Sequence, residues 1–410
     1  MVYEHSICNF AATGAVVSGK GLYSSVEWRA QDGNVNKFDI ECSWNPIEVS
    51  SSQSHCLIRG PGPFNLWKPV DQSEINKRGW VLQERLLSPR TVHFAAEALY
   101  WECRESYSMA FVSSHGLYDL ELYAMSKFHN QKAWVERTRQ AISRFMAGRG
   151  SLSEAYGIWD EIRRAYTSSA LTYPSDKLVA LSSVAAMLER FLSDKYLASI
   201  WGRTAVYDLL WHVREPRRRS SHGAPSWSWA SMNDGPILWS DRILPRYPHD
   251  AHQLATVIRA ETTAHNPHNP TGRVSSGRIE LQCFALVFDA AVGGFSEEFL
   301  REIHENEGSG FAPAGLPPID TVIDEGVNQV TDEQLFCLLL VLENRMVADH
   351  RFMLHGLIVA QQTDHFYRRI GYFRCWWESE CVSDLYWYLD RVGPASGNSR
   401  ANFYGLVTLI

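Results

Sequence analysis

The sequence has no cysteine pattern typical of a disulfide framework or a zinc site. Its eight cysteines are irregularly spaced over 410 residues and include no C-x-x-C pair. A chain of this length, with 45% hydrophobic residues, can bury a large core without covalent cross-links. We therefore expect reduced thiols and no metal site.

Long hydrophobic runs and a secretory leader are also lacking. The longest apolar run, residues 335–342, is far shorter than the roughly 20 residues that cross a bilayer. The first residues, MVYEHSICNF, do not place a basic stretch before an apolar one, as signal peptides do. The sequence therefore predicts a cytoplasmic protein without a membrane span.

Positive charge is scarce. The net charge is −7, and the one basic run, residues 217–219, is short. Nucleic-acid-binding proteins usually present a basic face and have a high isoelectric point. The composition therefore argues against nucleic acid as a partner, and it leaves open a protein partner or a hydrophobic small molecule.

Complete catalytic motifs are missing as well, including the G-x-S-x-G nucleophile elbow. Residues 14–21, GAVVSGKG, approach the phosphate-binding loop of NTPases, but Gly21 replaces the hydroxyl residue that binds Mg²⁺ and no amphipathic helix follows. Cys103 and His93 could form a nucleophile and base pair, yet a buried cysteine is commonly a small hydrophobic residue. We expect a turn at residues 14–21, and no cofactor.

Two H-x-x-H pairs, His249 with His252 and His265 with His268, are the nearest approach to a metal site. Structural zinc sites normally include thiolates, and catalytic zinc ligands lie on regular elements that hold their geometry. We interpret these histidines as part of an exposed, histidine-rich loop.

Tryptophan is abundant, with 15 copies where an average composition would give roughly one per hundred residues. Such side chains usually fill the core, because each buries a large apolar area. They could instead line an apolar cavity for a small molecule. The candidate pocket residues are Trp80, Trp101, Trp227 and Trp229, followed by Trp376, Trp377 and Trp387.

Hydrophobic periodicity divides the chain into three segments of an α+β fold. Residues 1–115 alternate short apolar runs with glycine, serine and proline, which predicts mixed strands and loops around one short helix. Residues 116–215 have helical spacing, with Ser151 and Glu154 forming a capping box, and predict a central helical layer. Residues 216–410 are predicted to form a β-rich C-terminal extension.

The C-terminal segment begins with a stretch, residues 216–275, whose proline, histidine, asparagine and arginine content predicts long loops. Several runs after it have the length and alternation of antiparallel strands. These runs are residues 278–288, 335–343, 354–361, 368–373 and 403–410.

The segment RGWVLQERLLSPR, residues 78–90, predicts a short helix that ends at Ser88, because Pro89 cannot continue a helix. Two strand-like pieces follow it, RTVHF and LYWEC, with the spacing of a hairpin. Polar and charged residues are threaded through these apolar pieces. They are Arg78, Gln83, Glu84, Arg85 and Glu102.

Charged side chains in such apolar surroundings can be buried only if they are paired, so we expect an internal Arg–Glu network. The network could be a structural clasp, or it could be a catalytic site, because both perturb the pKa values of their members. The candidate catalytic residues are Arg78, Glu84, His93 and Glu102.

Residues 78–105, RGWVLQERLLSPRTVHFAAEALYWECRE, resemble the third signature block of the fungal heterokaryon-incompatibility (HET) domain, which reads close to RGWTLQERLLSPR followed by a strand pair ending in FWEC. Residues 1–24 are similar to the family segment in which Met-x-x-Tyr precedes an alanine-rich strand. Blocks like LSYCWG and WIDALCINQ, with which family members usually begin, are not in this sequence. The segments that resemble the family's C-terminal extension are 168–185, 196–213, 224–237, 354–361 and 367–373.

The resemblance implies a partial HET-like domain in residues 1–115 and a role in fungal non-self recognition or cell-death regulation, without catalysis. The family's N-terminal blocks have been likened to TIR domains, some of which cleave NAD⁺, so residual NAD⁺ hydrolysis through Glu84 or Glu102 is one alternative. Another is an enzyme recruited to fungal secondary metabolism, with an aromatic-lined pocket. The sequence therefore leaves open whether the chain is an enzyme.

Overall fold

The computed structural model divides the chain into two compact units, Met1–Arg144 and Phe145–Ile410. The segment boundaries expected after residues 115 and 215 fall inside these two units. Among the described residues, no helix is long and apolar enough to cross a membrane. The described residues are 3–15, 68–95, 99–104, 107–113, 116–120, 134–219, 224–233, 235–239, 251–289, 294–295, 319–324, 333–344, 351–363, 365–378, 385, 389 and 403–410.

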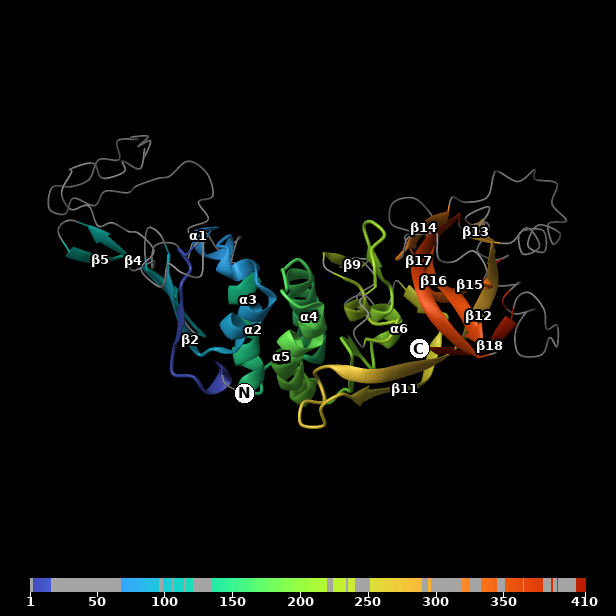
Figure 1. The fold of residues 1–410 in the computed structure, drawn as a ribbon, viewed down its shortest axis with the longest axis horizontal. Helices are drawn as coiled ribbons and strands as arrows, with labels where there is room; N and C mark the ends of the chain where they lie inside the picture. The colour runs from blue at the N-terminus through green and yellow to red at the C-terminus, as the bar shows by residue number, and fades with distance from the viewer. Residues whose placement is uncertain are drawn as a thin grey trace, which may run out of the picture. The chain divides into compact units, whose positions relative to one another are not determined.

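The N-terminal unit contains a five-stranded sheet in the order β1-β2-β3-β4-β5 (Figure 1). β1 (Asn9–Ala11) pairs in parallel with β2 (Arg90–Phe94), and β3 (Leu99–Cys103), β4 (Tyr107–Ser113) and β5 (Gly116–Leu120) follow as antiparallel neighbours. The predicted hairpin is confirmed as β2 and β3.

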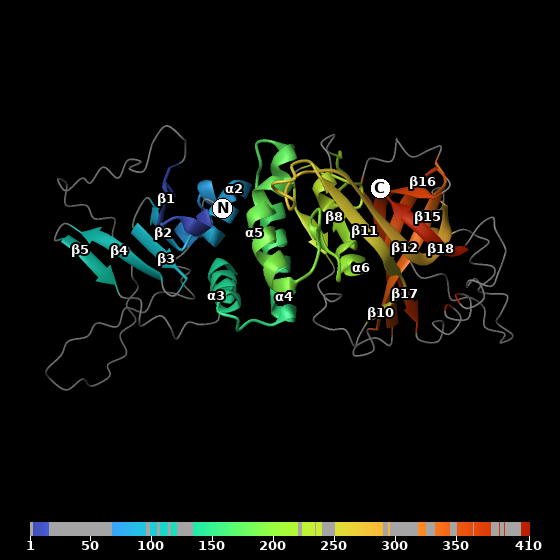
Figure 2. The same ribbon diagram turned by 90° about the horizontal axis from the view of Figure 1, so that it is seen from below.

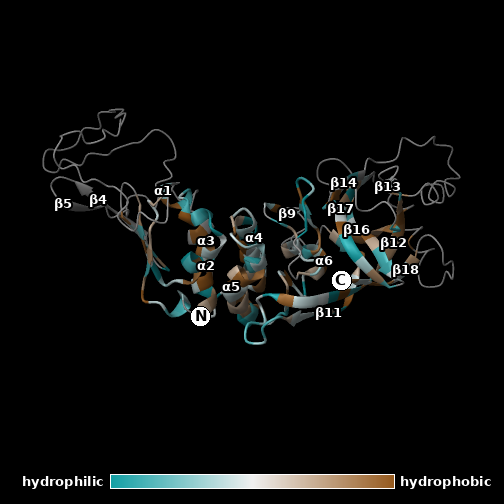
Figure 3. Cartoon of the chain, viewed as in Figure 1, coloured by the Kyte–Doolittle hydropathy of each residue, from teal (hydrophilic) through white to brown (hydrophobic). Residues whose placement is uncertain are grey.

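The helix predicted before the hairpin is also confirmed, as α2, and it ends before Ser88 and Pro89. α2 is buried at most of its positions, including Val81 and Leu86, and Figure 3 shows both hydrophobic and hydrophilic residues along α2 and α3. The helices that begin in this unit are η1 (Tyr3–His5), α1 (Lys68–Asp71), η3 (Ile75–Lys77), α2 (Gly79–Leu87) and α3 (Trp134–Met146).

The C-terminal unit begins with a pair of long helices that pack against each other, α4 (Leu152–Thr167) and α5 (Lys177–Leu192). α4 starts as predicted, because the Ser151 side chain accepts a hydrogen bond from the Glu154 backbone N–H at 3.2 Å. A short helix, α6 (Ala205–Asp208), follows them.

The main sheet of this unit closes on itself. β12 (Val274–Asp289) pairs with both β15 (Leu335–Asn344) and β18 (Phe403–Leu409), and β16 (Arg351–Thr363) and β17 (Phe366–Glu378) complete the ring (Figure 2). The β17–β18 pair is parallel and the other four are antiparallel. The strands predicted in this part of the chain are therefore confirmed.

The prediction of long loops for residues 216–275 is wrong in part. β10 (Ala251–Gln253) pairs with β15, and β11 (Thr256–Ala264) pairs along its length with β12. β11 is mostly exposed or half-buried and lies at the edge of the sheet, so its residues do not show the apolar alternation of a half-buried strand. The remaining short strands are β6 (Tyr196–Leu197), β7 (Ile200–Trp201), β8 (Trp211–Val213), β9 (Ile237–Trp239), β13 (Gly294–Phe295) and β14 (Ile319–Ile323).

β15 is buried on both of its faces, from Leu335 to Glu343. Side chains on one face of the closed sheet belong to a large apolar cluster that includes Cys337, Leu354 and Phe373. On the other side, α6 approaches β15 and β8 approaches β17. This double burial explains why LFCLLLVLE is a nearly continuous apolar run rather than an alternating one.

Candidate functional site

Glu102 is the centre of the ionic network in the N-terminal unit. Its Oε1 atom accepts hydrogen bonds from Arg85 Nε at 2.8 Å and from Arg139 Nη1 at 3.0 Å, and its Oε2 atom accepts one from Arg85 Nη2 at 3.0 Å. All three side chains are buried. The expected internal Arg–Glu network is therefore confirmed, and we call it the Glu102 cluster.

Among the side chains that contact one another in the Glu102 cluster, positive and negative charges are equal in number; half-buried Arg104 adds a further positive charge near Arg139. Arg85 also donates to Asp71 Oδ1 at 2.9 Å, so that two guanidinium groups meet two carboxylates, Asp71 and Glu102. Burial alone raises the pKa of Glu102, but the attraction of Arg85 outweighs it and holds the pKa below its ordinary value. Burial likewise lowers the pKa of Arg85, and Glu102 more than reverses this. Both groups therefore stay charged.

Arg139 joins α3 to the end of α2. Besides Glu102, it donates to the carbonyl oxygens of Arg85 at 2.9 Å, Ser88 at 2.8 Å and Pro89 at 3.3 Å. Carbonyl groups in the last turn of a helix lack partners within the helix, and a cation near them is favoured by the helix dipole. The Arg139 guanidinium thus caps α2, which Pro89 has ended.

His93 adds an imidazole to the Glu102 cluster. Its Nδ1 lies 3.0 Å from Thr13 Oγ1, and its Nε2 lies 3.2 Å from Glu102 Oε1. Burial lowers the pKa of His93 below 6.5, and Glu102 opposes this shift while the two arginines reinforce it. At neutral pH the ring is therefore uncharged.

The four candidate catalytic residues do not form one site. His93 and Glu102 are in contact, whereas Arg78 is exposed, contrary to the expectation that it lies among apolar side chains. Glu84 is half-buried and accepts a hydrogen bond from the Tyr3 hydroxyl at 2.9 Å. Burial, together with this carboxylate, raises the pKa of Tyr3 to about 12.

Three residues in or beside the cluster, Asp71, Arg139 and Thr13, are not predicted from the sequence. A signal for Arg139 is present, because it follows buried Val135 by four residues and precedes buried Ile142 by three, and so falls on the apolar side of α3. A charged residue at such a position needs a buried partner. Thr13 carries no comparable signal, since its contact with His93 joins residues 80 positions apart.

The candidate pocket tryptophans are divided between the two units. Trp80 and Trp101 are half-buried in the N-terminal unit, and Trp227 and Trp229 are fully buried in the C-terminal unit. Trp229 packs against Trp239, with ring centroids 6.3 Å apart. The pocket beside Trp229 has room for about one water molecule, so this side chain contributes to the core there.

The remaining motifs are placed as follows. Residues 16–21 of the glycine-rich segment, together with His249, the Trp377 side chain and Trp387, lie outside the described residues. His252, His265 and His268 are exposed, and Cys103 and Trp376 are half-buried. Within the described ranges, no group of His, Cys, Asp and Glu side chains is arranged to hold a metal ion.

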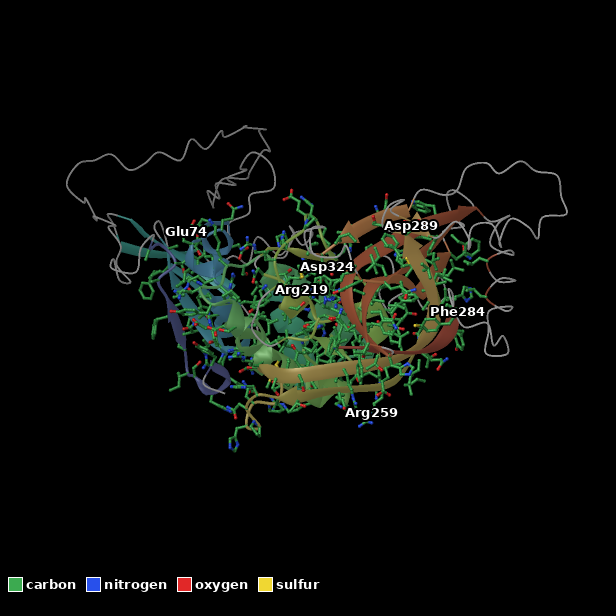
Figure 4. The ribbon with its side chains drawn as sticks, turned by 45° about the vertical axis from the view of Figure 1, so that its right-hand side comes forward. Glu74, Arg219, Arg259, Phe284, Asp289 and Asp324 are labelled. Atoms are coloured by element: carbon green, nitrogen blue, oxygen red, sulfur yellow. The ribbon has the colours of Figure 1, made fainter. Side chains whose placement is uncertain are left out.

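The C-terminal unit has a buried ionic cluster of its own. Arg369 and Asp324 are both completely buried and are joined by a 3.0 Å hydrogen bond, and Arg219 approaches the same carboxylate at 3.4 Å (Figure 4). The Arg369 guanidinium also stacks on Trp211, 3.4 Å from the ring centroid. Burial lowers the pKa of Arg369 to about 10, although Asp324 opposes the shift.

A second polar group lies on neighbouring strands of the closed sheet. His355 Nε2 contacts Glu343 Oε2 at 3.2 Å, and His355 Nδ1 contacts the Tyr372 hydroxyl at 2.7 Å. His212 stacks on the Tyr372 ring with centroids 4.7 Å apart. Burial, followed by the charge of Arg369, lowers the pKa of His212 to about 4. Glu343, His355 and Tyr372 are buried, which favours a structural role.

In each unit, arginine and carboxylate side chains therefore pair with one another in the interior. Comparison of the chain with protein-family models, curated proteins and solved structures finds no match.

Proposed function

We propose that the chain is a HET-type protein of fungal non-self recognition or cell-death regulation, which acts in the cytoplasm by binding a protein partner and not by catalysis. The observation that carries the proposal is the Glu102 cluster. It ties together α2, the β2–β3 hairpin and α3, and the first two are formed by the segment that resembles the HET signature.

The state of Glu102 supports a structural role for this segment. A general acid or base needs a pKa near the working pH and a path to the substrate proton. Glu102 instead accepts three hydrogen bonds from Arg85 and Arg139, and the Arg85 guanidinium holds its pKa below the ordinary carboxyl value. The lone pairs of the Glu102 carboxylate are therefore used by the two arginines and not by a substrate.

The first arm of the test is chemical. The purified chain is incubated with NAD⁺, and nicotinamide release is followed for the wild type and for Glu84→Gln, which removes the more accessible of the two candidate carboxylates. We expect no release above that of the variant. Release that depends on Glu84 would replace the proposal with NAD⁺ hydrolysis.

The second arm is biological. The chain is expressed from an inducible promoter in several filamentous fungal strains, and growth and co-purifying proteins are recorded. We expect growth arrest or a specific partner in at least one strain, and the same outcome for Glu84→Gln. Normal growth without any partner in every strain would contradict the proposal.

A further inference from the structure

Three donors compete for one oxygen atom in the Glu102 cluster. Arg85 Nε, Arg139 Nη1 and His93 Nε2 lie 2.8, 3.0 and 3.2 Å from Glu102 Oε1. A carboxylate oxygen offers about two lone pairs, so it cannot bind three donors equally well. His93, which is the most distant and carries no charge at neutral pH, is the weakest of the three.

Thr13 allows His93 to hold either protonation state. The Thr13 hydroxyl lies 3.0 Å from His93 Nδ1 and 3.3 Å from the Ala11 carbonyl oxygen. With a neutral ring the hydroxyl donates to Nδ1, and with a protonated ring Nδ1 donates to the hydroxyl, which turns and donates to Ala11. The buried ring therefore keeps a partner at Nδ1 with or without the additional proton.

The charge balance of the cluster does change with that proton. The described groups in contact around His93 are Arg85 on α2, Arg139 on α3 and Glu102 on β3, with Asp71 on α1 bound to Arg85. Half-buried Arg104, which directly follows β3, acts on Arg139 as a further positive charge. While the ring is neutral, two positive charges face two negative charges. Protonation leaves one positive charge in excess inside the unit, and an uncompensated buried charge is strongly destabilising.

We propose that His93 is a proton-operated latch for α3. When the ring takes up a proton, the imidazolium binds Glu102 Oε1 in place of Arg139, and repulsion between the two cations moves Arg139 away. Arg139 is the residue through which α3 holds the carbonyl groups at the end of α2. Acid therefore frees α3 from α2, and neutral pH restores the contact.

The order of events follows from the position of the ring. Burial lowers the pKa of His93 below its ordinary value of 6.5, so the latch is closed at neutral pH and opens only in acid. Glu102 remains ionised throughout this change, because its own pKa is held well below 4.5. The imidazole is thus the titrating member of the cluster in mildly acidic solution.

Hydrogen exchange of the full chain tests the latch. Protection factors of the α3 amides are measured from about pH 8 to about pH 5, the range in which a histidine titrates. One proton coupled to one opening changes the opening equilibrium by at most about tenfold per pH unit. We expect the protection of the α3 amides to fall with decreasing pH, at up to that slope, between about 6.5, where an ordinary histidine titrates, and the lower pKa of His93 in the closed unit. The protection of α5 should change less.

Two variants complete the experiment. His93→Gln keeps an N–H donor near Glu102 but cannot take up a proton, so its α3 protection should not depend on pH. His5→Gln removes an exposed histidine from the same unit and should behave like the wild type. Should either histidine variant disturb folding, the NMR titration of the His93 ring in the wild type decides the matter. The latch would be overturned if wild-type α3 protection did not depend on pH, or if the pH dependence persisted in His93→Gln. It would also be overturned if the His93 ring stayed neutral while α3 opened.

Discussion

A buried carboxylate needs positively charged partners, and buried guanidinium groups need negatively charged ones. Glu102→Gln leaves Arg85 and Arg139 facing a neutral amide in a buried site. We expect the free energy of unfolding of the N-terminal unit to fall by about 3 to 5 kcal/mol, the usual effect of breaking a buried ion pair. Urea unfolding followed by tryptophan fluorescence measures the change.

Glu84→Gln is the matched control for that substitution. Glu84 lies in the same unit, on α2, but it is half-buried and its partner is the neutral Tyr3 hydroxyl. Its replacement should cost only about 1 kcal/mol, as expected for one hydrogen bond. Equal decreases in the free energy of unfolding for the two variants would contradict the structural role of Glu102.

Backbone strain offers a second prediction at single residues. Ser193 ends α5 in the left-handed region, with φ 46° and ψ 42°, where a Cβ atom is unfavourable. Because the side chain is exposed, Ser193→Gly should stabilise the C-terminal unit by about 0.5 to 1 kcal/mol in thermal unfolding. Ser168, the exposed C-cap residue that follows α4, has φ −86°, so Ser168→Gly should instead be destabilising. The same sign for both would contradict the strain argument.

At the residue scale, the sequence predicted an internal Arg–Glu network in residues 78–102 but not which side chains pair in it. A buried charge without a partner is strongly unfavourable, so charged residues in an apolar segment predict an ionic network. They do not say which partners meet, because Arg139 reaches Glu102 from 37 positions away. Arg78 was expected to lie among apolar side chains but is exposed, because a residue just before a helix can turn to solvent whatever its neighbours are.

Among the strands, Gly356 on β16 shows how closely the closed sheet is packed. A Cβ atom added there would collide with the Leu338 carbonyl oxygen on β15 and with the Phe373 ring on β17. We expect Gly356→Ala to destabilise the C-terminal unit by about 1 to 3 kcal/mol or more, because the neighbouring backbone cannot move aside cheaply. Chemical unfolding measures the loss.

Gly405→Ala on β18 is the control within the same sheet. The nearest atom to its added Cβ would be a ring carbon of Phe403 at 3.1 Å, and the Phe403 side chain is only half-buried and can shift. The cost should stay below about 1 kcal/mol. A larger loss at Gly405 than at Gly356 would mean that the sheet is not packed as described.

Strands were predictable where burial leaves a mark on the sequence. β15 is buried on both faces and reads as a continuous apolar run, and β12 carries apolar alternation in its central part. β11 was missed because it lies at an edge and none of its residues is buried, so it lacks an apolar face; Arg259 and Glu261 form an ion pair on it at 2.8 Å. Its pairing with β12 is set by the hairpin, which periodicity does not reveal.

For the whole molecule, the sequence predicted the α+β class and the helical middle of the chain. Composition and periodicity report local burial, and these suffice for the class of fold. They do not report that β12 pairs with both β15 and β18 and so closes the sheet. Function is less accessible still, because partner choice depends on surface chemistry that no periodicity records.

Acid should weaken both units, through His93 in one and His212 in the other. Burial lowers both pKa values, that of His212 to about 4 with the help of Arg369. Between about 4 and 6.5 the unfolded chain therefore binds more protons than the folded chain, and stability rises with pH. Each histidine can contribute at most about 1.4 kcal/mol per pH unit in that window. Urea unfolding at about pH 7 and about pH 5 should show the loss, and His212→Gln should reduce it for the C-terminal unit alone. Stability that is constant or increases on acidification would refute the assignment of neutral rings in the folded chain.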